Sequence, residues 1–215
     1  MKNKIVSVGS IAIDELETPK GSHSNIIGGS ATFFSIAASK YNPVKVIGIV
    51  GTDFPQSGWD LFKKYNIDTD LITVKDGKTF SWGGKYSDDY STRDTLYTDL
   101  GVFENYNPEI NQSIDTEYLY LGNIQPSLQL DVINKINKKK RIVSDTMNLW
   151  INLDQEGLWE VIKKSDIFML NDEEAMELTG KNDLHEIAND FLELGPDIVI
   201  IKKGAKGSIL LSEDT

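Results

Sequence analysis

The sequence predicts an α/β fold, a doubly wound and mostly parallel sheet with helices on both faces. Short, continuous apolar runs of strand length recur through most of the 215 residues, and segments with apolar residues at helical spacing separate them. Uninterrupted apolar runs are typical of strands buried on both faces, and their alternation with amphipathic helices is typical of a parallel sheet. One polar, aromatic and turn-rich stretch breaks the alternation and predicts a small antiparallel addition.

The first expected elements follow one another closely. Residues 5–9 are short and β-branched, as expected of a buried strand, and apolar residues recur on one helical face across residues 30–41. Residues 44–50 form a second apolar run, and a helix is expected at residues 59–65. The order strand, helix, strand, helix is the one that a parallel sheet requires.

The break in the alternation lies at residues 71–102. Phe80, Trp82 and Tyr86 favour strands, and Gly83-Gly84 between them indicates a turn or a bulge. We interpret this stretch as a small antiparallel insert in the α/β body. A pair of edge strands on the main sheet is the alternative.

The second half of the chain returns to the alternation. The short basic run Lys138–Arg141 is expected to be a solvated helix end. Residues 1–215 are thus expected to form one α/β domain that carries the insert. The expected strands of this half are residues 118–121, 142–144, 167–170 and 197–201, and the expected helices are residues 128–136, 158–163, 173–179 and 187–194.

Composition excludes several classes of protein. The chain has 33 acidic and 22 basic residues, a formal net charge of −11, two histidines and no cysteine. The missing cysteine excludes disulfide scaffolds, zinc ribbons and thiolate catalysis, and the acidic balance argues against a nucleic-acid-binding protein. No apolar run approaches the roughly 20 residues of a membrane-spanning helix, and the first residues lack the pattern of a signal peptide. We expect a cytoplasmic protein without a membrane partner.

Polar residues that follow strands are the first candidates for a site, because ligands of doubly wound sheets collect at the carboxyl ends of strands. Asp14 could accept hydrogen bonds from a polyol, or lie in a turn before Pro19. Gly28 and Gly29 precede a helix, where glycines let a ligand approach the backbone and free N–H groups bind anions. An ordinary turn capped by Ser30 fits these residues equally well. The sequence contains neither a G-x-G-x-x-G pattern nor a Walker A loop.

Two more patterns lie in the second half. Asn171 and Glu174 predict a capping box at a helix start, and acidic groups at a strand end could also hold Mg²⁺, usually through water. The segment from Lys202 to Gly207 lies between two apolar runs and predicts a hairpin. Its glycines would also let a nucleotide lie against the backbone, with lysines near the phosphates.

The order and spacing of these motifs resemble the ribokinase-like (PfkB) family of carbohydrate and nucleoside kinases. The resemblance spans essentially the whole chain, and the insert falls where that family carries its β-lid. The segments that carry the resemblance are Gly9-Ser10 with Asp14, Gly28 to Thr32, Val46 to Phe54, Asp145 to Asn148, Asn171 to Glu174 with Leu178-Thr179-Gly180, and Lys203 to Gly207.

The resemblance implies a ribokinase-like fold and ATP-dependent phosphoryl transfer to a sugar hydroxyl, with ATP and Mg²⁺ bound. Such chemistry depends on positioning and charge stabilisation. The residues implied for substrate binding are Asp14, Gly28, Gly29, Phe33, Phe80, Trp82, Asn123 and Asn148. Those implied for nucleotide binding are Asn171, Glu174, Lys202, Lys203, Gly204 and Gly207, with Glu174 also serving the metal.

Two departures from the family pattern modify these expectations. Phe33 stands where many members have an asparagine, so one substrate hydrogen bond is expected to be missing. The family's Gly-Ala-Gly-Asp segment, whose Asp is the general base, does not occur up to Thr215. We therefore expect the base beyond Thr215 and name no catalytic residue. The chain is then the N-terminal portion of a kinase and inactive by itself.

Two other functions also fit the sequence. A nucleoside kinase of the same family is the first, because Phe33, Phe80 and Trp82 could stack on a base as readily as they cover a sugar. A non-catalytic sugar- or nucleotide-binding module is the second. Family members often pair through their lids, so a homodimer is expected. Otherwise the expected partners are small molecules, a sugar or nucleoside and ATP.

Overall fold

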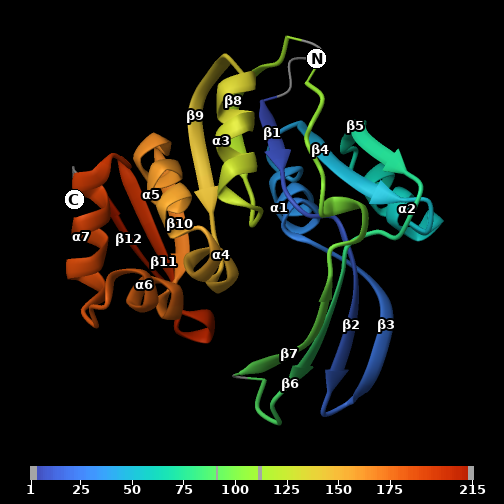
Figure 1. Ribbon diagram of the computed structural model, residues 1–215, viewed down its shortest axis with the longest axis horizontal. Helices are drawn as coiled ribbons and strands as arrows, with labels where there is room; N and C mark the ends of the chain where they lie inside the picture. Colours follow the sequence, from blue (N-terminus) through green and yellow to red (C-terminus); the bar gives the residue numbers. More distant parts are fainter. Residues whose placement is uncertain (1–3, 91, 111–112, 213–215) are drawn as a thin grey trace. The chain divides into compact units, whose positions relative to one another are not determined.

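The computed structural model describes residues 4–90, 92–110 and 113–212, and it confirms the mixed α/β fold (Figure 1). The chain divides into two compact units, an N-terminal unit within residues 3–109 and a C-terminal unit from residue 110 onward. Each unit has parallel strands and an apolar core of its own. Within the described ranges, no helix has the length and apolar character needed to cross a bilayer.

Three parallel strands form the α/β part of the N-terminal unit, with β4 between β1 and β5. All eight residues of β4 are buried, as expected of a strand covered on both faces. The elements are β1 (Ile5–Val8), α1 (Ser30–Ala38), β4 (Val44–Gly51), α2 (Gln56–Lys64) and β5 (Asp68–Lys75).

A second sheet of four strands, called here the lid sheet, belongs to the same unit (Figure 1). Its order is β3-β2-β6-β7, in which β2 and β6 are parallel and the outer strands are antiparallel to their neighbours. A short 3-10 helix, η1, follows it. The elements are β2 (Ala12–Thr18), β3 (Gly21–Gly28), β6 (Ser81–Tyr86), β7 (Arg93–Asp99) and η1 (Gly101–Phe103).

The lid sheet has different limits from the insert expected at residues 71–102. The strand β5 covers the start of that range but pairs with β4, and half of the lid sheet comes from residues 12–28. These residues lack a continuous apolar run because β2 and β3 expose side chains along most of their length. A search for buried strands therefore misses them. Asp14 accordingly lies within a strand and not in a turn.

The C-terminal unit has five strands in the order β12-β11-β10-β9-β8, all parallel except β12. Its core includes Phe168 and Phe191, whose rings meet edge to face at 5.2 Å between centroids. The strands are β8 (Asp115–Leu121), β9 (Lys138–Asp145), β10 (Ile167–Asn171), β11 (Ile198–Lys202) and β12 (Ser208–Ser212). The helices are α3 (Pro126–Lys135), α4 (Asn148–Leu153), α5 (Gln155–Lys164), α6 (Asp172–Thr179) and α7 (Leu184–Leu194).

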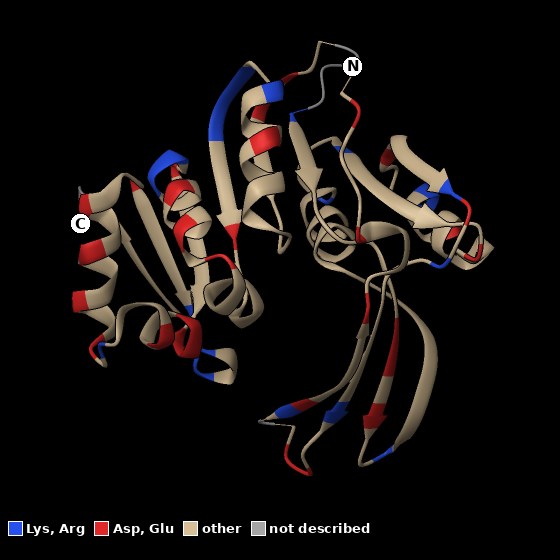
Figure 2. Ribbon diagram, in the orientation of Figure 1, with Lys and Arg blue, Asp and Glu red and all other residues tan. Residues whose placement is uncertain are grey.

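The basic run Lys138–Arg141 opens β9 and is not the helix end that the sequence suggested (Figure 2). Lys139 Nζ donates to two carbonyl groups at the end of α3, both at 2.7 Å, and Arg141 pairs with Asp166 and Asp197. A lysine that binds the last carbonyls of a helix stabilises that end. The run lies at the amino end of the parallel strands, opposite the edge where ligands bind.

Candidate functional site

Asp14 lies on β2, and its neighbours are shaped around its carboxylate. In register with it are Trp82 on β6 and Ile26 on β3, and residues in register project from the same face of a sheet. A Cβ atom on Gly28 would overlap the Asp14 carboxylate. Glycine at this position therefore makes room for the carboxylate.

The Asp14 carboxylate is partly buried and incompletely paired. Its Oδ1 atom is buried and has no hydrogen-bond partner among the described residues. Burial raises the pKa of Asp14 from its ordinary value of 3.8 to about 6, and a hydrogen bond from the Trp82 backbone N–H offsets part of the rise. An unpaired buried acceptor costs free energy, and such groups concentrate at functional sites. Chemically, Oδ1 is a ready acceptor for a ligand hydroxyl.

The turns at Ser10 and at Gly29-Ser30 close on each other. Ser30 N–H donates to Ser10 Oγ at 3.0 Å, Ser10 N–H donates to Ser30 Oγ at 3.2 Å, and Ala31 N–H donates to the Ser10 carbonyl at 3.0 Å. Gly29 has a φ of 98°, and a side chain there would overlap the Ser10 carbonyl. The first two amides of α1 are thus used within the protein and are not the free anion-binding groups that the sequence allowed.

The three aromatic candidates differ in the surface that they offer a ligand. Trp82 Nε1 donates to Thr95 Oγ1 at 3.2 Å, which fixes its ring on the lid sheet. Phe80 packs edge to face on Phe103, with 6.0 Å between ring centroids. Phe33, in the first turn of α1, is 61% exposed. The ring of Phe33 is therefore the most available for stacking, and Trp82 is the ring that shares a sheet face with the unpaired carboxylate.

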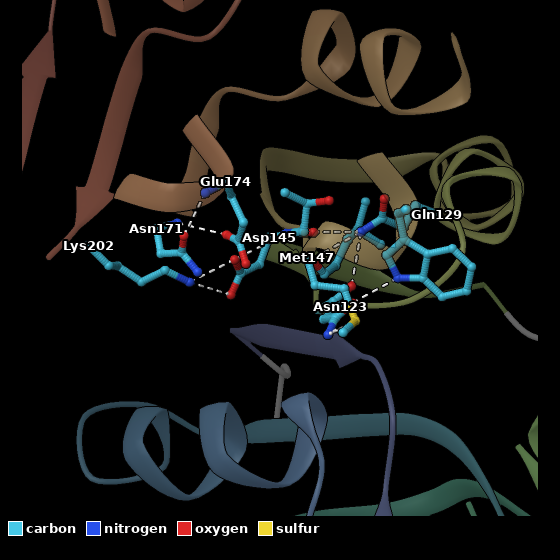
Figure 3. Close-up of polar contacts among 11 residues, drawn as sticks. Asn123, Gln129, Asp145, Met147, Asn171, Glu174 and Lys202 are labelled. Atoms are coloured by element: carbon cyan, nitrogen blue, oxygen red, sulfur yellow. Dashed lines mark hydrogen bonds and ion pairs between the residues drawn. The ribbon is translucent and has the colours of Figure 1, made fainter. Parts of the chain in front are cut away.

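In the C-terminal unit, polar side chains gather where β9, β10 and β11 end (Figure 3). The predicted capping box is confirmed, because Glu174 N–H donates to Asn171 Oδ1 and Asn171 N–H donates to Glu174 Oε2, both at 2.7 Å. Glu174 is only 5% exposed. At least one of its carboxylate oxygens is therefore committed to closing the start of α6.

Lys202, the last residue of β11, pairs with Asp145, the last residue of β9 (Figure 3). Lys202 Nζ lies 2.8 Å from Oδ1 and 3.1 Å from Oδ2 of Asp145. Thr146 N–H and the Tyr120 side chain also hydrogen-bond to this carboxylate, and Gln129 Nε2 donates to the Asp145 carbonyl. Burial, and then the charge of Asp145, raise the pKa of Tyr120. The positive charge expected to serve phosphates is thus neutralised by a firmly held carboxylate.

The two candidate asparagines have side-chain partners within the C-terminal unit. Asn123 Oδ1 accepts from Trp150 Nε1 at 2.8 Å, and Asn123 Nδ2 donates to Met147 Sδ at 2.8 Å (Figure 3). Asn148, the first residue of α4, donates to the carboxylate of Glu177 on α6. A ligand that bound either amide would have to compete with these contacts.

The predicted hairpin is confirmed, since β11 and β12 pair in antiparallel register with Lys202 opposite Ser208. Its turn contains a 3-10 helix, η2 (Gly204–Lys206), with φ of 54° at Gly204 and 87° at Gly207. Both values favour glycine, and a Cβ atom at either position would meet no atom within 4 Å. Lys203 N–H closes the turn on the Gly207 carbonyl at 2.8 Å. Backbone conformation explains both glycines, and the space around them remains open.

The acidic residues fit only one kind of magnesium site. Within the part of the chain that the structure describes, no three His, Cys, Asp or Glu side chains lie together in a way that could hold a metal ion. Glu174 is a single carboxylate, and Asp145 is paired with a lysine. Because Mg²⁺ often binds through one or two carboxylates, substrate phosphates and water, these residues fit a metal carried by a triphosphate. They do not fit a metal enclosed by protein ligands.

Two polar connections at strand ends could not be predicted from the motifs of the sequence. The Asp145–Lys202 pair joins residues 57 positions apart, and a pair of hydrogen bonds between Asp53 and Thr79 joins residues 26 positions apart. In the sequence, Asp53 is only part of a motif, and Asp145 has no feature that supports a role for it. Both lie at or just after the carboxyl end of a parallel strand, and that position was the signal that could have singled them out.

The pKa of Asp14 leads to a prediction about stability. Its folded-state pKa of about 6 exceeds its ordinary value of 3.8, so between these values the folded state holds more protons than the unfolded state. Ionised Asp14 therefore opposes folding, with a penalty that is absent below about pH 4 and complete above about pH 6. We expect Asp14→Asn to raise the free energy of unfolding at pH 7.5 and to have little effect at pH 4. Urea unfolding of both proteins across this range measures the difference, and a constant difference would contradict the prediction.

Comparison with known proteins agrees with the fold and the motifs. The chain matches the profile of the pfkB family of carbohydrate kinases over residues 2–215. It is 26% identical over 215 residues to a cytidine kinase of Thermococcus kodakarensis, a match that covers 96% of this chain and 75% of that protein.

Two solved structures show the same fold. The nucleoside kinase of Methanocaldococcus jannaschii, an archaeal member of the ribokinase family, has a TM-score of 0.77 at 20% identity, over 100% of this chain and 75% of that one. A putative ribokinase II of E. coli, in complex with ATP and Mg²⁺, has a TM-score of 0.75 at 17% identity, over 99% of this chain and 76% of that one. Because the family profile matches nearly every residue, this chain belongs to the pfkB family of carbohydrate kinases.

Proposed function

We propose that this pfkB-family phosphotransferase transfers the γ-phosphoryl group of ATP to a hydroxyl group of a nucleoside, with a free sugar as the alternative acceptor. The observation that carries the proposal is the unpaired Oδ1 of Asp14 beside Gly28. A hydroxyl donor of a ribose or another sugar would satisfy this buried acceptor.

Two observations favour the nucleoside over the free sugar, although the sequence alone put the sugar first. Phe33 is exposed in the first turn of α1, and an aromatic ring that stacks on a base contributes about 1–3 kcal/mol. Among the similar proteins, one is named a cytidine kinase and another a nucleoside kinase. A free sugar lacks the flat aromatic face that such a ring binds.

In the proposed reaction, the acceptor oxygen forms a bond to the γ-phosphorus while the bond to ADP breaks. Asp14 would orient the acceptor through its hydroxyl group, and Trp82 and Phe80 would cover the acceptor and exclude water. When bound, Mg²⁺ would offset charge on the triphosphate, and Glu174 would face it through water. The hydroxyl proton passes to a general base, and we assign that role to none of the described residues.

The proposed nucleotide site is the hairpin turn with the start of α6. Gly204 and Gly207 leave open space beside the backbone, and Lys202 has a flexible stem whose side chain is 44% exposed. For Lys202 to bind a phosphate, its ammonium group must exchange the Asp145 carboxylate for a phosphate oxygen. Lys203, in the same turn, would supply a second positive charge.

Acceptor binding tests the proposed function directly and needs no general base. We expect cytidine or another nucleoside to raise the melting temperature, whereas ribose and fructose do not. At about ten times Kd the stabilisation is about 1.4 kcal/mol, or about 3–6 °C for a chain of this size. Asp14→Asn should abolish the shift, and the matched control Asp94→Asn on exposed β7 should retain it.

The other outcomes of this panel separate the alternatives. Stabilisation by free sugars alone would replace the nucleoside with a sugar acceptor. ATP is tested in the same way. If an acceptor stabilises the chain and ATP does not, a non-catalytic binding module is favoured. No stabilisation by any acceptor would refute the proposed site.

ATP binding tests the nucleotide site. We expect Lys202→Met to weaken ATP binding about tenfold, the effect of one lost charge-assisted hydrogen bond, with unchanged acceptor binding. Lys163→Met, at an exposed position of α5, is the matched control. Lys202→Met leaves the Asp145 carboxylate without its cation, which lowers the stability of the fold. The double variant with Asp145→Asn removes that carboxylate too, so a loss of ATP affinity can be told apart from a loss of stability. Calorimetry that finds wild-type ATP affinity in the double variant would remove Lys202 from the site.

We also propose a homodimer that forms through the lid sheet. Tyr90, Leu96 and Tyr97 are exposed on or near β7, and exposed apolar groups that form a contiguous patch mark interaction surfaces. Light scattering should give twice the mass of one chain, and Leu96→Glu should halve it. A monomeric mass for the wild-type chain at micromolar concentration would contradict this proposal.

A further inference from the structure

Asp53 and Thr79 connect the carboxyl end of β4 to the start of β6. The Thr79 backbone N–H and the Thr79 hydroxyl each donate to Asp53 Oδ1 at 2.7 Å. Thr79 Oγ1 also accepts from Gly51 N–H at 2.9 Å. Thr79 is 2% exposed, so one buried hydroxyl both donates and accepts in a place where an unpaired group is costly.

Close backbone contacts hold the same segment. A side chain on Gly51 would overlap the Gly77 carbonyl, and a side chain on Gly101, which has a φ of 51°, would overlap the Lys78 carbonyl. Val102 N–H donates to that carbonyl of Lys78 at 2.9 Å. The chain that enters β6 is therefore fixed both to the end of β4 and to η1.

The residues that follow connect this segment to Asp14. Ile13 N–H donates to the Phe80 carbonyl at 2.9 Å, and the Trp82 backbone N–H hydrogen-bonds to the Asp14 carboxylate. Ile13 and Asp14 lie on β2, and Phe80 directly follows Thr79. A displacement of Thr79 would therefore pass to the strand that carries Asp14 through two hydrogen bonds.

We propose that Asp53 and Thr79 are positioning residues that set the place of Asp14 for acceptor binding, by fixing where β6 leaves the α/β part of the unit. This inference rests on the proposed role of Asp14 as the acceptor-binding carboxylate. A purely structural role would lower stability alone. A positioning role lowers acceptor affinity and leaves ATP affinity intact, because the proposed nucleotide residues belong to the other unit.

The main test replaces the Thr79 hydroxyl while keeping the shape of the side chain. Thr79→Val removes both hydrogen bonds of the hydroxyl. We expect it to weaken binding of cytidine, or of the nucleoside that binds best, about tenfold. ATP affinity measured by calorimetry should stay unchanged. Thr79→Ser keeps the hydroxyl and should restore nucleoside affinity, and Thr73→Val, at an exposed position of β5, is the matched control. Equal loss of nucleoside and ATP affinity, or no loss of either, would overturn the inference.

Hydrogen exchange without ligand provides an independent measurement. In Thr79→Val, the amides of residues 12–18 and 81–86 should exchange about tenfold faster, because local opening becomes easier, whereas those of residues 167–171 should not change. If Thr79→Val fails to fold, Asp53→Asn keeps the shape of Asp53 without its charge and should show the same pattern more weakly. If the wild-type chain binds no acceptor, the proposed function fails, and the exchange rates still decide whether Thr79 fixes the lid strands. Unchanged exchange in the lid strands would refute it.

Discussion

The close contact between Gly28 and the Asp14 carboxylate is the constraint on which the polar site of the N-terminal unit depends. Any side chain at residue 28 would displace the carboxylate. One carboxylate oxygen, Oδ1, has no hydrogen-bond partner among the described residues, and burial makes the charged form of Asp14 unfavourable. Such a group persists only where the surrounding hydrogen bonds fix it, and here the pairing of β2 with β6 does so. A structural aspartate would gain stability from a partner, so the lack of one among the described residues is the main support for the proposed ligand.

The polar groups of the C-terminal unit follow a different rule, because most of them already have partners. Asn123 and Glu174 bind neighbouring groups of the protein. Lys202 binds the Asp145 carboxylate, which two other groups also hold, the Thr146 N–H and the Tyr120 side chain. These contacts restrain the side chains at the strand ends before any ligand arrives. A nucleotide at the proposed site would therefore have to displace existing contacts, whereas an acceptor at Asp14 would complete one that is missing among the described residues.

The features predictable from the sequence were those whose cause is local. The capping box at Asn171 and the hairpin at Gly204 depend on residues three to five positions apart, and both are confirmed. The lid strand β2 was missed because it has no buried apolar run. The Asp145–Lys202 pair was missed because the two residues meet only once β9, β10 and β11 lie side by side. Strand order decides which side chains meet at a sheet edge. No spacing of residues in a single sequence shows that order.

Because the net charge of the chain is −11, phosphate binding depends strongly on whether Lys202 is already paired. An acidic chain offers ATP no general attraction, so phosphate binding depends on local positive groups. Lys202 already has a full carboxylate partner, and exchanging that partner for a phosphate replaces one charged hydrogen bond by another. An anion that binds only Lys202 therefore gains little affinity, because the Asp145 carboxylate loses its cation and that loss costs free energy. A triphosphate that also contacts the hairpin backbone can offset that cost, whereas free phosphate cannot. The ion pair would thus make Lys202 selective for a correctly seated nucleotide.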